Sequence, residues 1–293
     1  SGTLLIQNGD FSSQTLQAGG AAHGQQIAGE TNVSAAQGGQ GYFTLAGGTF
    51  RTGQTDIGAA DITGTSQGHV AVNGGVMATD RLNALHGTLS VEGPSGAALL
   101  TGTQDTGWKR WLKGQRWLEA RLERRPDGTL VVTGGQTLDL SSPALSWQVG
   151  TGATDSLLHA GSENGFGDNS LTIVDARAFV DSGQTVLKVG DARTSASAQL
   201  LLIADDNLKT GDHFSLLEGG EAWQNENVRE TSRLLDTTLV TDATGTSAEM
   251  SGADLNQTLS GLRQTVGELL SRMTETLGVN TQSDNQGQTL VSR

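Results

Sequence analysis

The chain has 293 residues, which is enough to bury a sizeable core, and it contains no Cys. The lack of Cys excludes disulfide bonds, thiolate metal sites and a Cys nucleophile. The formal net charge of −13 disfavours nucleic acid and anionic membranes as partners.

Gly accounts for 42 residues and Pro for only 3, a composition typical of many short strands joined by tight turns. No apolar run is long enough for a membrane-spanning helix, and no signal peptide is present. The chain opens on Ser1 and stops at "LVSR", which we interpret as a fragment excised from a longer protein.

A repeat of the form Gly-x-apolar-x-apolar organises the first half of the chain. The copies are "GTLLIQNG" from Gly2, "GYFTLAGG" from Gly41, "GHVAVNGG" from Gly68, "GTLSVEG" from Gly87 and "GTLVVTGG" from Gly128. Apolar residues two positions apart face the same side of a strand, and glycines allow sharp turns. Strands separated by loops of unequal length predict a β-solenoid whose coils stack, with a Gly-rich antiparallel sandwich as the alternative.

An aromatic and basic segment begins at Gly107, and it holds three of the five Trp residues of the chain. A β-hairpin is predicted over residues 117–133 from three features. Apolar and polar residues alternate from Trp117, the turn residues "RPDG" follow, and "TLVVTGG" has the pattern of a returning strand. Its first part could be a ligand platform, because aromatic faces stack on sugars and cations engage acidic groups. The candidate ligand-binding residues are Trp108, Lys109, Arg110, Trp111, Lys113 and Arg116. The alternative is that the Trp rings cover an end of the core, with Lys and Arg stems packed over them.

Strand-like segments continue at 170–180, 185–192, 198–206 and 213–220. A cap or linker is expected over 221–250, in which "NENVRETSRLL" could form a short helix. Apolar residues at steps of three and four predict an amphipathic helix over 251–279, followed by a tail at 280–293. The helix could pack on the solenoid, dock elsewhere or self-associate.

Several parts of the chain resemble the C-terminal part of a bacterial autotransporter passenger. They are the coils "GTLLIQNGDF", "YFTLAGGTF" and "HVAVNGGVM", the late block "LLIADDNLKTGDHFSLLEGG" and the helix-bearing segment after it. Such passengers are pertactin-like or adhesin-like right-handed parallel β-helices on the outer membrane surface, with a C-terminal folding cap. The resemblance implies a cell-surface or secreted location and host or bacterial surface proteins or glycans as partners. The translocating β-barrel of the family has no counterpart in this sequence.

Signals for catalysis and metal binding are weak. The five His residues form no zinc motif, and Ser66 in "GTSQG" is interpreted as a turn residue because a strand rather than a helix follows it. Asp168 in "NGFGDNSLTI" matches half of one calcium-binding repeat, which we interpret as a turn. We therefore expect no metal, no cofactor and no catalytic residues.

The sequence thus predicts a mainly β protein: a right-handed parallel β-helix over 1–220, with a hairpin insertion and a C-terminal helix. The expected function is an adhesion or display scaffold rather than an enzyme. Two alternatives stay open. One is a glycan-active β-helix enzyme, for which Glu163, Asp168 and Asp205 would have to converge in a groove. The other is a structural oligomer joined through the C-terminal helix.

Overall fold

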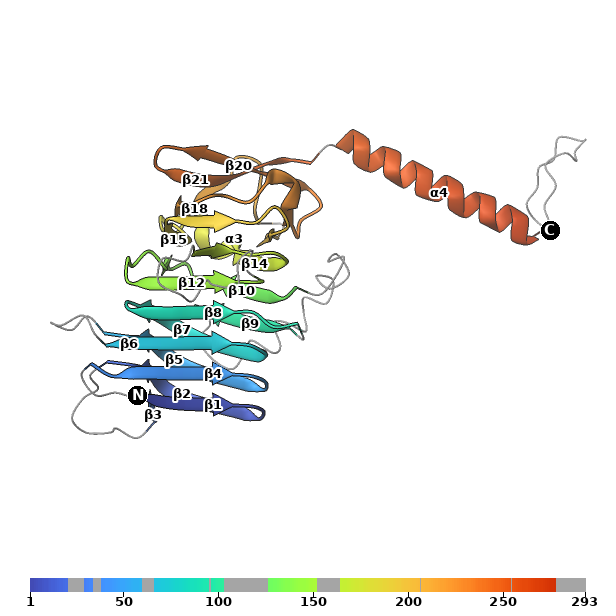
Figure 1. The fold of residues 1–293 in the computed structure, drawn as a ribbon. Coiled ribbons are helices and arrows are strands. Elements are labelled where there is room, and N and C mark those ends of the chain that lie inside the picture. The colour runs from blue at the N-terminus through green and yellow to red at the C-terminus, as the bar shows by residue number, and fades with distance from the viewer. Residues whose placement is uncertain are drawn as a thin grey trace, which may run out of the picture. The chain divides into compact units, whose positions relative to one another are not determined.

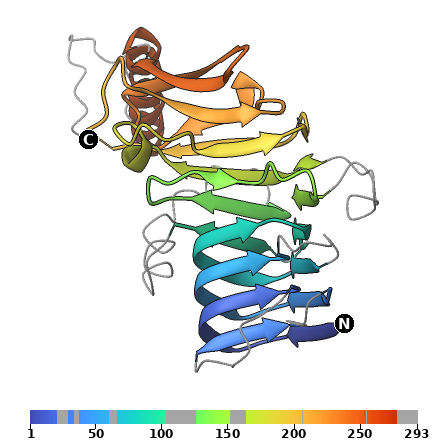
Figure 2. The same ribbon diagram turned by 90° about the vertical axis from the view of Figure 1, so that its left-hand side faces the viewer.

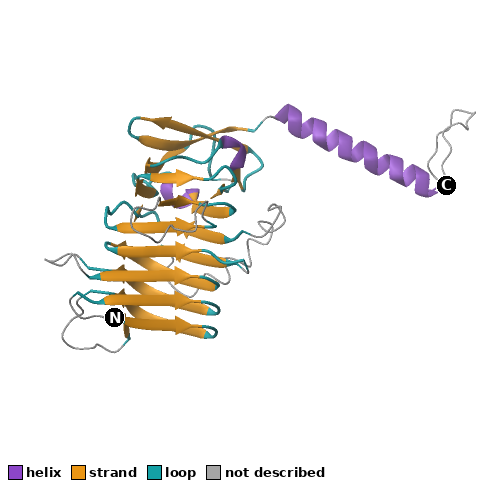
Figure 3. Cartoon of the chain, in the orientation of Figure 1, coloured by secondary structure: helices purple, strands orange, loops and turns teal. Residues whose placement is uncertain are grey.

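The computed structural model describes residues 1–20, 29–33, 38–59, 66–94, 96–102, 126–151, 164–205, 207–253 and 255–277. The chain divides into two compact units, Ser1–Ser251 and Gly252–Arg293. The described part of the first unit is mainly β, and that of the second is mainly one helix (Figure 3). Each unit is described by itself below.

Seven strands form the first sheet, and every neighbouring pair in it is parallel. In sheet order they are β1 (Gly2–Ile6), β4 (Gln40–Leu45), β6 (Gln67–Val72), β8 (Gly87–Val91), β12 (Leu145–Val149), β13 (Asn164–Phe166) and β16 (Ala192–Thr194). Figure 1 shows β1, β4, β6, β8 and β12 stacked one above the other.

The second sheet has nine strands, also paired in parallel. In sheet order they are β19 (Val228–Glu230), β17 (Gln199–Ile203), β14 (Ser170–Asp175), β10 (Gly128–Val132), β9 (Ala97–Thr101), β7 (Gly75–Ala84), β5 (Thr49–Ile57), β2 (Asp10–Ala18) and β3 (Glu30–Val33). The chain passes back and forth between the first and second sheets, as the turned view shows (Figure 2).

A third sheet of five strands belongs to the C-terminal half of this unit. Its order is β11 (Leu138–Asp139), β15 (Leu187–Gly190), β18 (His213–Gly219), β21 (Gly245–Gly252) and β20 (Leu235–Asp242). The β11–β15 and β15–β18 pairs are parallel, whereas β18 and β21 are antiparallel. The described part of this unit also contains two short helical turns, α3 (Ala176–Phe179) and η1 (Asn225–Asn227).

The core consists of apolar rows that run across the strands of the first sheet. One row joins Leu4, Phe43, Val70, Leu89 and Trp147, and the next joins Ile6, Leu45, Val72, Val91, Val149 and Phe166. The expected apolar pairs of the repeat are therefore confirmed for β1, β4, β6 and β8, because each strand adds one residue to each row. The side chains of Trp147 and Phe166 pack edge to face with ring centroids 5.0 Å apart.

The glycines that open the repeats of β4 and β6 lie where two backbones approach closely. A Cβ atom on Gly68 would lie 2.0 Å from the carbonyl oxygen of Ala18. A Cβ atom on Gly41 would lie 2.1 Å from the carbonyl oxygen of Val33. Gly is therefore required at these positions by contact between the first and second sheets and not only by a turn.

The repeat at Gly128 behaves differently from the other four copies. Its strand, β10, lies in the second sheet, while β12 takes the next place beside β8 in the first. Both edges of β10 are occupied by parallel strands, β9 and β14. Residues 128–132 are thus not the antiparallel return strand that we expected for a hairpin over 117–133, and residues 117–125 lie outside the described part of the chain.

Three of the four later strand segments are confirmed by β15, β17 and β18. In the segment 170–180, β14 ends at Asp175 and α3 follows, so the strand expected there is confirmed only for its first half. Residues 221–250 contain η1, β19 and β20 and most of β21, so the short helix expected in "NENVRETSRLL" is a single 3-10 turn followed by a strand. The second unit contains α4 (Leu255–Leu277), in agreement with the helix expected over 251–279. The tail at 280–293 lies outside the described residues.

Candidate functional site

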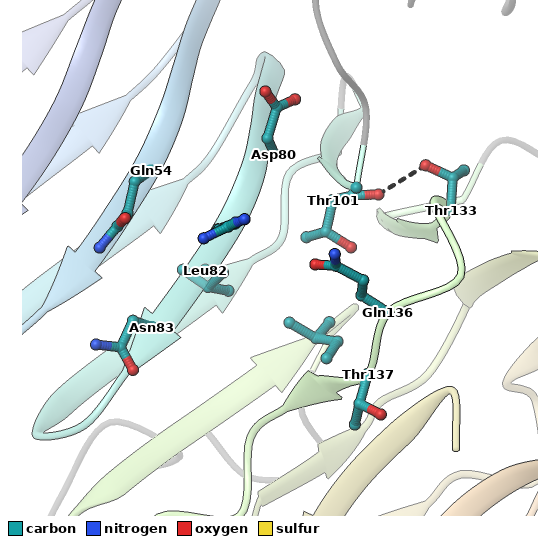
Figure 4. A pocket seen from close by; sticks show the side chains of 11 residues that line it. Gln54, Asp80, Leu82, Asn83, Thr101, Thr133, Gln136 and Thr137 are labelled. Carbon is teal, nitrogen blue, oxygen red and sulfur yellow. Dashed lines mark hydrogen bonds between the residues drawn. The ribbon is translucent and has the colours of Figure 1, made fainter. Parts of the chain in front are cut away.

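A polar groove of about 320 Å³ opens beside the second half of β7 (Figure 4). It exists because β9 is short: its strand pairing covers Gly75–Thr79 of β7 and stops before Asp80. The chain after β10 passes along this side of β7 at residues 136–138. The lining residues are Gln54, Asp80, Arg81, Leu82, Asn83, Thr101, Gly102, Thr133, Gln136, Thr137 and Leu138.

Amide and hydroxyl groups dominate the lining of the groove. Figure 4 shows Gln136 close to Thr101, with Asn83 on the neighbouring β7. Local hydrogen bonds hold two of these groups in place: Thr133 Oγ1 donates to the carbonyl oxygen of Thr101 at 2.9 Å, and Gln54 Nε2 donates to Asp56 Oδ1 at 3.0 Å. Such groups bind a ligand by hydrogen bonds, which sets orientation and specificity.

A second, smaller hollow of about 150 Å³ shares Asp80 with the groove. Its lining residues are Ser12, Ser13, Arg51, Thr52, Gly53, Ala78 and Asp80. Asp80 therefore marks the meeting point of the two hollows, which extend over β2, β5, β7 and the segment after β10.

Asp80 occupies a bend that recurs in three neighbouring strands. The ladder pairs Thr52 with Thr79 and then Gln54 with Arg81, so it passes over Gly53 and Asp80. A hydroxyl group fixes the bend, since Thr79 Oγ1 donates to the carbonyl oxygen of Arg81 at 2.7 Å. The same bond joins Thr52 Oγ1 to the carbonyl oxygen of Gln54 at 3.0 Å.

The six residues predicted from sequence as a ligand platform, Trp108, Lys109, Arg110, Trp111, Lys113 and Arg116, lie outside the described residues. The chain enters this segment directly after Gly102, which lines the groove. Their role stays a prediction.

Of the carboxylates considered for a glycan-active enzyme, Asp168 and Asp205 line neither hollow. Asp168 accepts a hydrogen bond from Ser195 Oγ, and its backbone bridges to Thr151. Asp205 forms an ion pair with Arg177, with 3.6 Å between Oδ2 and Nη1. Glu163 lies outside the described residues.

The strand expected after Ser66 is confirmed. The side chain of Ser66 is buried, its Oγ accepts a hydrogen bond from the backbone nitrogen of Gly38 at 2.8 Å, and strand β6 follows. Within the described ranges, no group of three or more His, Asp or Glu side chains could hold a metal ion.

Asp80, Arg51, Arg81 and Gln136 are not among the residues predicted from the sequence. Charged residues such as Asp80 and Arg81 are common on protein surfaces, so their presence in a strand carries no special meaning in the sequence. A signal did exist: Arg51 and Arg81 are the only Lys or Arg residues among the first 108 positions.

Searches for related proteins give no match to a family model, a curated protein or a solved structure. Among the residues that the structure describes, no helix is both long and apolar enough to cross a membrane.

Proposed function

We propose that the chain is a right-handed parallel β-helix that works as an adhesion or display scaffold, comparable to an autotransporter passenger on a bacterial surface or in secreted form. The parallel, in-register pairing of strands over two large sheets supports the β-helix. Right-handedness follows from the strong preference of parallel crossover connections for that hand. In this arrangement each coil templates the next, so folding can propagate along the stack.

The groove beside β7 is the observation that carries the binding function. It is a preformed polar concavity on a rigid sheet, and its amides and hydroxyls match the hydroxyl groups of saccharides or the backbone of an extended protein segment. We therefore assign the contact with a surface glycan or surface protein to this groove.

The groove favours binding over hydrolysis. Glycosidases of the common classes need a pair of carboxyl groups at the scissile bond. Among the described residues that line the two hollows, Asp80 supplies the one carboxylate. An adhesion scaffold is consequently the better supported function than a glycan-active enzyme.

A glycan and matrix-protein array tests the adhesion function. We expect the full chain to retain at least one ligand and the Asn83→Ala/Gln136→Ala variant to lose most of that binding. An array without any ligand above background would contradict the adhesion function. The Trp108→Ala/Trp111→Ala variant belongs on the same array, and binding equal to that of the unaltered chain would refute the predicted ligand platform.

A second candidate function, self-association through α4, is favoured by one observation. Val266, Leu269, Leu270, Met273 and Leu277 on α4 are between 46% and 57% exposed. Their steps of three and four place most of them on one stripe of the helix. Sedimentation velocity at several protein concentrations tests this candidate with the full chain and with a chain ending at Ala253. If α4 mediates self-association, the sedimentation coefficient should depend on concentration for the full chain and not for the shorter chain.

A further inference from the structure

We propose that the groove and the adjoining hollow together bind an acidic oligosaccharide, one that carries carboxylate or sulfate groups. Arg51 and Arg81 would contact the anionic groups, and the amides of the groove would contact the sugar hydroxyls. This inference rests on the proposed adhesion function and narrows its ligand class.

Within residues 1–108, the positively charged side chains lie at these two hollows. Residues 1–108 contain two Lys or Arg residues, Arg51 and Arg81, in a chain with a net charge of −13. Arg81 lines the groove and Arg51 lines the adjoining hollow. All the Lys and Arg side chains of this part of the sequence thus meet in one place, on either side of Asp80.

Neither guanidinium group is engaged by another described residue. Within the described part of the chain, no ion pair or hydrogen bond involves the side chain of Arg51 or Arg81, whereas Arg177 binds Asp175 at 2.8 Å and also pairs with Asp205. A guanidinium group presents a planar fork of donors that fits a carboxylate or a sulfate. Two such groups in concave sites are therefore ready to receive anions from a ligand.

The spacing of the two arginines suits an oligomer. Arg51 pairs with Ala78 and Arg81 pairs with Gln54, so the two Arg residues lie three positions apart on adjacent strands. From a rise of about 3.3 Å per residue and a strand spacing of about 4.8 Å, their Cα atoms are at most about 11 Å apart. Anionic groups on separate sugar units of one chain can reach both.

The lining also favours a charged ligand over a neutral one. Among the described residues of both hollows no aromatic side chain is present. At these described residues the affinity therefore comes from hydrogen bonds and ion pairs and not from stacking of sugar rings on aromatic faces. Asn83, Gln136 and Thr137 provide donors and acceptors for hydroxyl groups, and the two Arg residues outnumber Asp80.

Titration calorimetry with the full chain tests the proposal with three probes of equal length: an oligogalacturonate, a sulfated heparin fragment and a neutral cello-oligosaccharide. We expect at least one acidic probe to bind at least tenfold more tightly than the neutral probe. Arg51→Gln and Arg81→Gln should each weaken the binding of that acidic probe about tenfold, the loss of one charged hydrogen bond. Binding should also weaken as NaCl rises from about 0.05 M to about 0.5 M.

Arg272→Gln is the matched control, because it makes the same change on an exposed position of α4 and should leave binding unchanged. Thermal unfolding of each variant verifies that it is folded. Equal affinity for acidic and neutral probes, or full acidic binding by Arg51→Gln/Arg81→Gln, would overturn the inference and leave the adhesion function standing. If no probe binds while the array finds a protein ligand, the saccharide class is wrong. If the array also finds no ligand, the adhesion function itself fails.

Discussion

The ring of Tyr42 stacks on the ring of His69, with centroids 4.5 Å apart and 13° between the ring planes. Both residues lie in the first sheet, in paired positions of β4 and β6. The His69 nitrogens have polar partners: Nδ1 lies 2.8 Å from Thr88 Oγ1, and Nε2 lies 3.2 Å from Gln40 Oε1. The neutral imidazole satisfies both, because one nitrogen accepts from the hydroxyl group and the other donates to the amide oxygen.

This environment makes the stability of the β unit sensitive to pH. Burial lowers the pKa of His69, and the nearby His86 lowers it further. The unfolded chain takes up the proton near the ordinary pKa of about 6.5, and the folded chain does so only at lower pH. The contribution of neutral His69 to the free energy of unfolding is therefore complete above about pH 6.5, and it is lost as the pH falls through the lowered pKa of the folded chain.

When the pH is lowered from about 7.5 to about 5.5, we expect the urea midpoint of unfolding to decrease more in the unaltered chain than in His69→Gln. His213→Gln, a change on the exposed end of β18, serves as the control and should retain the full pH dependence. Identical pH dependence in His69→Gln and the unaltered chain would show that His69 makes no such contribution.

Gly68 should not tolerate a methyl group. Gly68→Ala would press its Cβ to 2.0 Å from the carbonyl oxygen of Ala18, and we expect a loss of about 1–3 kcal/mol or more in the free energy of unfolding. A Cβ atom on Gly267 of α4 would meet no atom within 4 Å outside its chain neighbours and the nearby backbone of its own helix, so Gly267→Ala should instead stabilise the helix by about 1 kcal/mol. Urea unfolding measures the first effect and helical circular dichroism the second; a harmless Gly68→Ala would contradict the close approach.

Among the described residues, Trp147 is the largest fully buried side chain. It packs on Phe166, which in turn contacts Trp223 at 4.6 Å between ring centroids. Trp147→Ala should reduce the free energy of unfolding by about 3–5 kcal/mol. Phe11 is half exposed, and Phe11→Ala should cost less than about 1 kcal/mol. Similar losses for the two variants in denaturant unfolding would be inconsistent with the aromatic row as a main part of the core.

The β unit should fold without the C-terminal helix. Strand β21 ends at Gly252, and the compact unit ends at Ser251. A chain that ends at Ala253 should therefore unfold cooperatively at the same temperature as the β unit of the full chain. A truncated chain that is unfolded or melts far below the full chain would show that residues beyond 253 stabilise the sheets.

The sequence specifies much of this fold because each position of the repeat has a structural role. Leu4/Ile6, Phe43/Leu45, Val70/Val72 and Leu89/Val91 have the spacing that a half-buried strand requires, and they form the core rows. Helix α4 follows as directly from its apolar stripe.

The repeat does not specify which sheet a strand joins. "GTLVVTGG" and "GTLSVEG" look alike, yet β10 and β8 belong to different sheets, since alternation encodes a buried face and not a neighbour. The groove could not be predicted for the same reason. It depends on β9 ending at Thr101 while β7 continues to Ala84, which is a relation between two strand lengths.

At the bend in the long strands, the side chain can differ without any change in the strand pairing that stabilises the β unit. Gln14, Gly53 and Asp80 occupy equivalent positions in β2, β5 and β7, and the ladder resumes in register after each. An amide, a bare backbone and a carboxylate are thus accepted at one structural position. New chemistry can arise there by single substitutions without loss of strand pairing, so a lineage of such proteins could change what it recognises while its scaffold stays the same.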